Sequence, residues 1–231
     1  MNEKIAIIGL GYVGIPLAVE FGKKFNTIGY DLNKKRIEEL NNSIDNISNI
    51  SKDEFLKSKK LSFTENLSNL KECNIYIIAL PTPINKNNKP DLNILFKATS
   101  DIASILSKGD IIIYESTVYP GCTEDDCVPI LEKKSGLKFN IDFYCGYSPE
   151  RINPGDKDKT LTKIIKITSG SDKKTAEKID NLYKSILEVD TYPVSSIKVA
   201  EAAKIIENCQ RDINIAFVNE LAILFNLLNI D

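Results

Sequence analysis

The stretch that decides the fold is Lys4-Ile5-Ala6-Ile7-Ile8-Gly9-Leu10-Gly11-Tyr12-Val13-Gly14-Ile15-Pro16-Leu17-Ala18. Its apolar run, 5–8, has the length and β-branched content of a buried parallel strand. The run enters Gly9-x-Gly11-x-x-Gly14, and the apolar residues that follow have helical spacing. In such a strand–turn–helix unit the first glycine permits the tight turn, the second lets a pyrophosphate approach the backbone, and the third lets helix and strand pack closely. The amides at the helix N-terminus then face the phosphates.

A lone Gly-x-Gly-x-x-Gly is a weak indication, and the next strand strengthens it. Residues 27–30 read as a second strand, and Asp31 follows it, seventeen residues after Gly14. A dinucleotide fold places there the carboxylate that accepts hydrogen bonds from the adenosine ribose hydroxyls. The same carboxylate would repel the extra phosphate of NADP, so the sequence favours NAD, although the basic residues 34–36 weaken that preference. The alternative is an ordinary glycine turn beside a surface aspartate.

Composition narrows the possible functions. The 231 residues are 42% hydrophobic and 27% charged, and the net charge of −2 gives no reason to expect nucleic acid or an acidic membrane as a partner. No apolar run approaches the roughly 20 residues that cross a bilayer. The chain also starts directly in its first strand, without a signal-peptide pattern, so we expect a cytoplasmic protein. Five scattered cysteines argue against disulfides or a metal site, and the absence of histidine excludes Ser-His and Cys-His chemistry.

The rest of the chain alternates between apolar runs and helical patterns, which is typical of an α/β fold with a doubly wound parallel sheet, a Rossmann domain. Expected strands lie at 74–80, 110–115, 140–145 and 164–169, and expected helices at 34–42, 52–58, 92–106, 123–134 and 173–186. Pro81-Thr82-Pro83 ends the first of these strands because proline cannot continue a ladder. Ligands bind at this carboxyl edge in open α/β sheets. We expect residues 1–195 to form an NAD-binding Rossmann domain.

The C-terminal segment, 196–231, predicts one long connecting helix, because 196–229 contains neither Gly nor Pro. About 30 helical residues would span about 45 to 50 Å. One apolar stripe comprises Ile206, Ile213, Phe217, Leu221 and Leu224, whereas Ile205, Ile215, Ile223 and Leu227 fall on other faces. One stripe can pack on the chain's own sheet, but the other needs burial by a second copy or a further domain. We therefore expect a homodimer through this helix.

Several separated motifs occur in the order that is typical of one family. They are 4–31, Leu80-Pro81-Thr82-Pro83, Ser116-Thr117-Val118-x-Pro120-Gly121, Ser148-Pro149-Glu150-Arg151 and Ala200-Glu201-Ala202-Ala203-Lys204-x-x-x-Asn208. With these motifs the chain resembles the nucleotide-sugar dehydrogenases of the UDP-glucose/GDP-mannose dehydrogenase family. The stretch 147–157 is most similar to the branch that acts on UDP-N-acetylhexosamines in bacterial capsule and O-antigen synthesis. The resemblance covers the whole chain but only about the first half of a family member, so 196–231 would begin a truncated central domain.

The resemblance implies an NAD-dependent double oxidation of the sugar C6 alcohol to a carboxylate, through a thiohemiacetal and a thioester on a cysteine. Lys204 and Asn208 lie four residues apart on one helix face and would stabilise the C6 oxyanion. Glu150 would be the base for the hydrolytic water. Thr117 would hold that water or contact the nicotinamide. The ordinary alternatives are a solvated lysine, a surface glutamate and a threonine that caps the next helix. The predicted cofactor-binding residues are Gly9, Gly11, Tyr12, Val13, Gly14, Asp31, Arg36, Pro81, Thr82, Pro83, Ser116 and Thr117, and the predicted substrate-binding residues are Glu150, Arg151, Ile152, Asn153, Lys204 and Asn208.

Two departures from the family pattern matter. Pro154 stands where the UDP-glucose branch has a second glutamate, which argues against UDP-glucose as the substrate. The family nucleophile lies in a glycine-rich Cys motif, which none of the five cysteines matches. Cys209 follows Asn208 but has the wrong neighbours. We therefore expect that this chain does not turn over substrate by itself.

Two other functions remain open. A non-catalytic module that senses NAD or NADH would explain the missing nucleophile, but it has no use for the residues assigned to catalysis. A different Rossmann oxidoreductase, of the 6-phosphogluconate or hydroxyacyl-CoA dehydrogenase type, would rely on histidine or on a differently placed lysine. The histidine-free sequence and the motif at 148–156 weigh against it.

Overall fold

A computed structural model describes residues 3–48, 50–151 and 161–230. Within them, eight strands form one sheet in the order β3-β2-β1-β4-β5-β6-β7-β8. The strands are β1 Lys4–Ile8, β2 Asn26–Tyr30, β3 Leu61–Thr64, β4 Ile75–Ile78, β5 Ile111–Tyr114, β6 Tyr144–Tyr147, β7 Ile167–Gly170 and β8 Tyr192–Pro193. The helices are α1 Gly14–Gly22, α2 Lys34–Asn41, α3 Lys52–Lys57, α4 Asn93–Ala103, α5 Val128–Ser135, α6 Lys173–Lys184 and α7 Ile197–Leu227, with short helical turns η1 Leu67–Leu70, η2 Cys122–Cys127 and η3 Leu161–Lys163.

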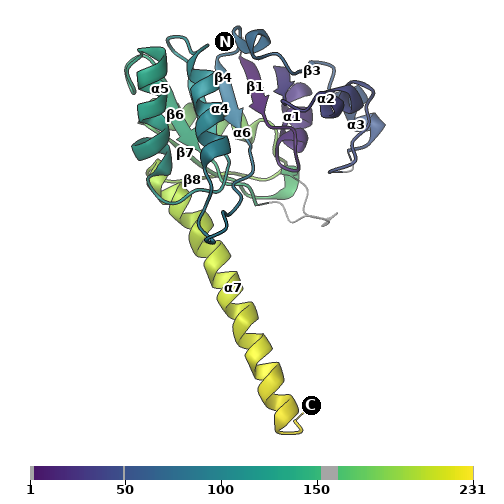
Figure 1. Cartoon of the computed structure of the whole chain (residues 1–231). Coiled ribbons are helices and arrows are strands. Elements are labelled where there is room, and N and C mark those ends of the chain that lie inside the picture. The colour runs from purple at the N-terminus through teal and green to yellow at the C-terminus, as the bar shows by residue number, and fades with distance from the viewer. Residues whose placement is uncertain (1–2, 49, 152–160, 231) are drawn as a thin grey trace.

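The sheet has a hydrophobic core on each face. Successive strand residues point to opposite faces, so Ile5 and Ile7 enter one core while Ala6 and Ile8 enter the other. The first core packs against α1, α2, α3 and α6, and the second against α4, α5 and the first turn of α7. Burial on both faces explains why β1, β4 and β5 read as continuous apolar runs rather than alternating ones. The predicted α/β Rossmann fold is confirmed (Figure 1).

One pairing departs from the predicted parallel sheet. β6 and β7 are antiparallel, with Gly146 opposite Gly170 and Tyr147 opposite Ser169. A parallel connection between neighbouring strands needs a crossover, usually a helix. Between β6 and β7 the described residues contain only the short turn η3. The chain therefore returns in the opposite direction, and this brings the residues just before β7 to the carboxyl end of β6.

The sequence patterns missed two edge elements and shifted others. β3 carries the polar Ser62 and Thr64 and pairs with β2 alone, so it lacks the apolar run of a central strand. β8 is two residues long. The helix expected at 123–134 is the π-helical turn η2 continued by α5, and the strand expected at 140–145 is β6, which begins four residues later.

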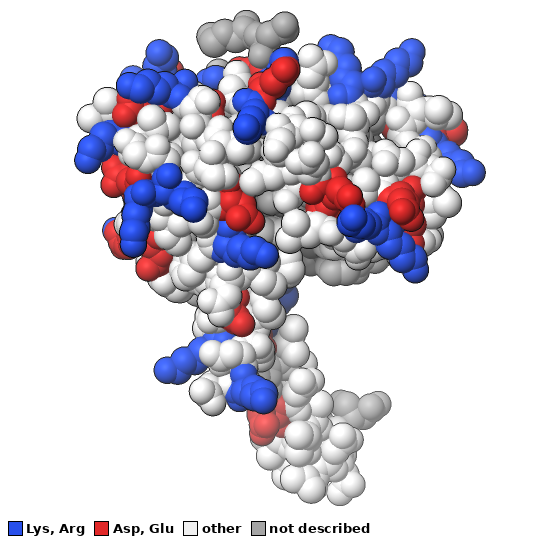
Figure 2. Space-filling view, turned by 45° about the horizontal axis from the view of Figure 1, so that its top comes forward, with Lys and Arg blue, Asp and Glu red and all other residues white. Residues whose placement is uncertain are grey.

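Helix α7 projects away from the body of the molecule (Figure 1). Its N-cap is Ser196, whose Oγ accepts the Val199 amide at 3.3 Å, and only its first turns are buried. Beyond them, both apolar faces lie in solvent: Phe217 of the first stripe is 61% exposed, and Ile215 on another face is 56% exposed. The expectation that one stripe would pack on the chain's own sheet is wrong, because the helix leaves the sheet before the stripe begins. In Figure 2 the charges are interspersed over the body, while the far end of α7 is mainly uncharged. Among the described residues, no helix is long and apolar enough to span a membrane.

Candidate cofactor and substrate site

The glycine turn between β1 and α1 has the geometry of a phosphate cradle. Gly9 has φ of +92°, and its amide donates to the Tyr30 carbonyl at 2.9 Å. A Cβ on Gly14 would lie 1.7 Å from the Gly9 carbonyl oxygen, so only glycine permits this approach of helix to strand. A Cβ on Gly11 would meet nothing within 4 Å, so the backbone there faces open space. The turn therefore offers bare backbone and a helix N-terminus to a ligand, as the sequence predicts.

Asp31 follows β2 and is bound to the glycine turn. Its Oδ2 accepts the Leu10 amide at 2.9 Å, and its Oδ1 accepts the Asn33 amide at 2.9 Å. Beside it lies a cavity of about 330 Å³, lined mainly by apolar residues from the ends of β1 and β2 and from α4. A half-buried carboxylate at the edge of an apolar pocket suits a ribose attached to a flat base such as adenine.

Arg36 lies beneath the glycine turn. Its side chain is 5% exposed, its Nε donates to the Leu10 carbonyl at 3.0 Å, and its Nη2 pairs with Asp45 Oδ1 at 2.6 Å. Burial disfavours the ionised form of Asp45, but hydrogen bonds from the Ile50 amide and Arg36 outweigh it and lower the pKa of this carboxyl. The Arg36 Nη1 has no hydrogen-bond partner among the described residues. A buried guanidinium nitrogen without a partner beside an open glycine turn fits an anionic ligand such as a pyrophosphate.

The segments after β4 and β5 are joined to each other. The Leu80 amide, just before Pro81-Thr82-Pro83, donates to Ser116 Oγ at 3.1 Å, and the Tyr147 hydroxyl donates to the Ser116 carbonyl at 3.0 Å. Thr117 is half-buried. The helical turn that follows has Gly121 as its N-cap, without a side-chain bond, so Thr117 does not cap it. The structure thus brings two predicted cofactor-binding segments together at one edge of the sheet.

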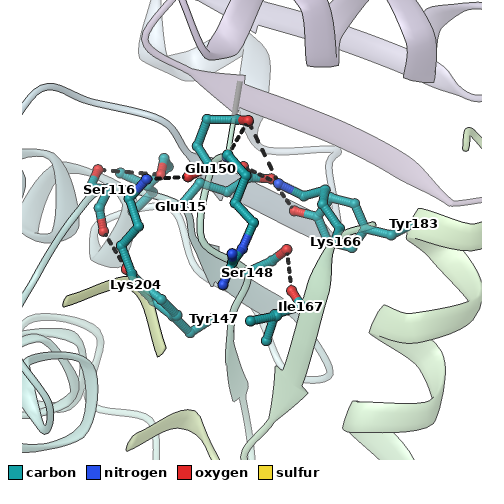
Figure 3. A network of polar contacts seen from close by, with 11 residues as sticks. Glu115, Ser116, Tyr147, Ser148, Glu150, Lys166, Ile167, Tyr183 and Lys204 are labelled. Carbon is teal, nitrogen blue, oxygen red and sulfur yellow. Dashed lines mark hydrogen bonds and ion pairs between the residues drawn. The ribbon is translucent and has the colours of Figure 1, made fainter. Parts of the chain in front are cut away.

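A buried charged cluster lies behind this edge (Figure 3). Glu115 Oε2 accepts from the Lys166 ammonium at 2.6 Å, and its Oε1 accepts from the Tyr183 hydroxyl. Burial raises the pKa of Glu115 to about 7, although Lys166 and Tyr183 act in the opposite direction. Glu150 contributes its Oε2 at 3.7 Å from the Lys166 ammonium. Glu150 is 7% exposed, so it is not a surface loop residue.

The first turns of α7 bring Lys204 to Glu150. The Lys204 ammonium donates to the Glu150 carbonyl oxygen, and burial lowers the pKa of this lysine. Lys204 is therefore not an ordinary solvated lysine. Arg151 forms an ion pair with Glu207, and Asn208, one turn beyond Lys204, is exposed. The predicted substrate contacts Ile152 and Asn153 lie outside the described residues.

Glu201 joins α7 to the segment after β5. It is fully buried, and its Oε2 and Oε1 accept the amides of Gly121 and Thr123 at 2.5 Å and 2.9 Å. Burial raises the pKa of Glu201, against the opposing hydrogen bonds from Thr123 and Gly121. Glu201 thus holds the loop that carries Thr117.

Sequence reasoning gave no role to the charged residues that organise this region. They are Glu115, Lys166 and Glu201, together with their hydrogen-bonded partner Tyr183. Two of these residues could have been recognised from the sequence. Lys166 lies inside the apolar run 164–169, and Glu115 directly follows the apolar 111–114. A charged side chain in a buried strand needs an oppositely charged partner. Lys166 therefore predicts a buried acidic residue, and Glu115 predicts a buried basic one. In the part of the chain that the structure describes, no group of three or more Cys, Asp or Glu residues could hold a metal ion.

Comparison with known proteins identifies the family of the chain independently of the structure. The family model of the UDP-glucose/GDP-mannose dehydrogenase family, NAD binding domain, matches residues 3–187, and the model of that family's central domain matches 198–231. The chain belongs to the UDP-glucose/GDP-mannose dehydrogenase family. This confirms the resemblance inferred from the motifs, and it confirms NAD as the cofactor.

Two relatives and one solved structure are similar to nearly the whole chain. The UDP-N-acetyl-D-glucosamine 6-dehydrogenases of Salmonella typhi and Pseudomonas aeruginosa are 60% and 58% identical to the chain over 228 residues, which are 99% of this chain and 54% of each relative. The solved structure of the UDP-D-ManNAc dehydrogenase from Pyrococcus horikoshii superposes with a TM-score of 0.88 at 35% identity, covering 96% of this chain and 53% of that one. The chain therefore spans about half the length of the curated relatives it matches.

Proposed function

We propose that this chain is the NAD-binding half of a UDP-N-acetylhexosamine 6-dehydrogenase, which oxidises the C6 alcohol of UDP-GlcNAc or UDP-GalNAc to a uronate. The observation that carries the proposal is the meeting of three separated motifs: Lys204 of α7 contacts Glu150 after β6, and Tyr147 hydrogen-bonds the segment with Ser116 and Thr117 after β5. The names of the two relatives given above support the N-acetylhexosamine branch. The name of protein CapL of Staphylococcus aureus, 51% identical, supports a role in capsule synthesis.

The residues divide into a cofactor side and a substrate side. On the cofactor side, Asp31 would accept hydrogen bonds from the adenosine ribose, the glycine turn would hold the pyrophosphate, and Thr82 and Pro83 would line the second ribose. Tyr12, Val13 and Pro81 belong to the same proposed surface. Bound NAD supplies the hydride acceptor for the sugar C6 carbon.

On the substrate side, the proposed role of each residue follows from its surroundings. A half-buried ammonium with a lowered pKa, as at Lys204, stabilises negative charge on the C6 oxygen more strongly than a solvated one. Asn208 would add an amide donor from the same helix face. Glu150 would remove the proton of the hydrolytic water, and Thr117 would hold that water or contact the nicotinamide. Arg151 would contact the sugar nucleotide, and Ile152 and Asn153 extend this segment in sequence.

The rest of the enzyme would supply the nucleophile and the remaining nucleotide contacts. None of the cysteines matches the glycine-rich motif expected for the nucleophile: Cys73, Cys122, Cys127 and Cys145 are buried and Cys209 is exposed. We place the boundary between the Rossmann domain and the connecting helix at 195/196. We further propose that α7 pairs with a second copy, which would cover its exposed apolar faces. The cytoplasmic location stays a prediction.

The experiment compares the isolated chain with a fusion to the complementary C-terminal part of the Salmonella typhi relative. NADH formation at 340 nm is followed with UDP-N-acetylglucosamine, UDP-N-acetylgalactosamine and UDP-glucose. We expect NAD binding in both proteins but turnover only in the fusion, with little activity on UDP-glucose. Lys204→Met should lower kcat by 100-fold or more, as loss of one oxyanion donor does, about 3 kcal/mol.

The matched control is Lys198→Met, a lysine on the same helix whose ammonium is 3.2 Å from an Asp125 carboxylate oxygen and whose side chain is 52% exposed. It should leave kcat unchanged. Steady NADH formation by the isolated chain, or an undiminished kcat in Lys204→Met, would contradict the proposal. NAD binding without turnover in the fusion would favour an NAD-sensing module instead.

A further inference from the structure

A buried aspartate near the glycine turn has no role in the proposed chemistry. Asp45 lies between α2 and α3, and its side chain is 0% exposed. Its Oδ1 accepts from Arg36 Nη2 at 2.6 Å and from the Ile47 amide at 3.1 Å. Its Oδ2 accepts the amides of Ser48 and Ile50 at 3.1 Å and 3.0 Å. One carboxylate therefore binds an arginine of α2 and the backbone that follows that helix.

The partners of Asp45 contact the glycine turn. The Arg36 Nε donates to the Leu10 carbonyl at 3.0 Å, and Ser48 Oγ donates to the Tyr12 carbonyl at 3.3 Å. Both carbonyls belong to the turn between β1 and α1. Asp45 is therefore connected to the turn by two routes, although it does not touch the turn itself.

The guanidinium of Arg36 keeps one nitrogen for a ligand. Its Nε is bound to Leu10 and its Nη2 to Asp45, whereas its Nη1 is buried and has no hydrogen-bond partner among the described residues. A guanidinium is a rigid planar fork, so two fixed nitrogens also fix the direction of the third. A buried donor without an acceptor is unfavourable, and the oxygens of a pyrophosphate at this turn are suitable acceptors.

The charge of Asp45 balances the charge of Arg36. Burial alone would raise the pKa of Asp45, but hydrogen bonds from the Ile50 amide and Arg36 lower it, so the carboxylate is ionised at neutral pH. A buried guanidinium without its carboxylate would be strongly destabilised. The ion pair therefore holds the guanidinium in place before a ligand binds, which reduces the cost of ordering it on binding.

We propose that Asp45 is a positioning residue for the cofactor: it holds Arg36 against the glycine turn so that Nη1 donates to the pyrophosphate of NAD. Its effect on NAD passes through Arg36 rather than through Ser48. Asp45 itself would not touch NAD, because both of its oxygens are engaged within the protein. This inference rests on the cofactor side of the proposed function, which places the pyrophosphate at the glycine turn.

The test is a double-mutant cycle on NAD affinity, measured by calorimetry on the chain as it stands. The wild type is compared with Arg36→Met, Asp45→Asn and the double variant. We expect each single change to weaken NAD binding about tenfold or more, the effect of losing a hydrogen bond to a charged group. In the Arg36→Met background, Asp45→Asn should change NAD affinity by less than about twofold, because the residue through which it acts is absent.

A second variant covers the risk that Asp45→Asn unfolds, since that change leaves Arg36 buried without its carboxylate. Asp45→Glu keeps the charge but adds one methylene, so it cannot keep the same four hydrogen bonds. It should weaken NAD binding in the wild-type background and not in Arg36→Met. Urea denaturation identifies the variants that are folded under the assay conditions. The matched control is Asp53→Asn, the same change at an exposed site of α3, which should leave NAD affinity unchanged.

NAD binding as tight as that of the wild type in the folded Asp45 variants would overturn the proposal. An equal loss in the wild-type and Arg36→Met backgrounds would also overturn it, because Asp45 would then support the turn without Arg36. The same holds if the wild-type chain does not bind NAD. Sugar oxidation by the fusion tests the proposed function separately. A fusion that oxidises no sugar nucleotide would leave the NAD affinities, and with them this inference, unaffected.

Discussion

The contact between α7 and the loop after β5 depends on one carboxylate, Glu201, and its replacement by glutamine measures that contact. Glu201 accepts two backbone amides, from Gly121 at 2.5 Å and from Thr123 at 2.9 Å, and it is fully buried. Glutamine keeps the shape and one acceptor oxygen, but it turns an NH₂ group toward the second amide. The variant therefore loses one hydrogen bond outright and the charge on the other.

The magnitude follows from these two bonds. A hydrogen bond to a charged group contributes about 1.5 to 3 kcal/mol, and a buried amide left without an acceptor costs about 1 to 3 kcal/mol. Burial raises the pKa of Glu201, so desolvation of its charge offsets part of this stabilisation. We expect the free energy of unfolding to fall by about 2 to 3 kcal/mol. In a chain of this size that lowers Tm by about 4 to 12 °C.

The assay is urea denaturation followed by circular dichroism at one protein concentration, with and without NAD. The matched control is Glu220→Gln, which changes the same residue type at an exposed site on the same helix and should stay within about 0.5 kcal/mol of the wild type. Because Glu201 holds the loop with Thr117, NAD affinity should also weaken in Glu201→Gln but not in the control. Equal stability of the two variants would refute the reasoning.

Three further predictions concern pH, the cofactor and association. Burial raises the pKa of Glu115 from 4.5 to about 7, so native protein holds a proton that the unfolded chain releases, and the free energy of unfolding should fall by about 3 kcal/mol as pH rises from 4.5 to 7. Urea denaturation at both pH values should show that this change in the free energy of unfolding is absent in Glu115→Gln. The same change in the variant as in the wild type would contradict the prediction. Asp31→Ala should weaken NAD binding by about 1 to 3 kcal/mol in calorimetry, and tighter binding of NADP than of NAD by the wild type would remove Asp31 from its role. Phe217→Asp should convert a dimer to a monomer in multi-angle light scattering at low micromolar concentration, whereas a wild-type monomer unaffected by the change would mean that α7 does not pair.

The sequence by itself determined the local elements and the cofactor side. Gly9 and Gly14 predict the turn because a positive φ and a close helix–strand approach are properties of a few adjacent residues. Asp31 could be assigned because its distance along the chain from the turn is characteristic of dinucleotide folds. The long helix could be recognised from the absence of Gly and Pro in 196–229, whereas its Ser196 cap was found in the structure.

Only the tertiary structure decided which charges meet. Glu115 and Lys166 are 51 residues apart, and Lys204 and Glu150 are 54 apart, so their contacts depend on strand order and on the antiparallel return of β7. The apolar stripes of α7 can also be recognised in the sequence, but only the structure shows that they are exposed. Periodicity and turn chemistry act over a few residues, whereas the pairing of a buried charge depends on whichever distant segment the sheet places beside it.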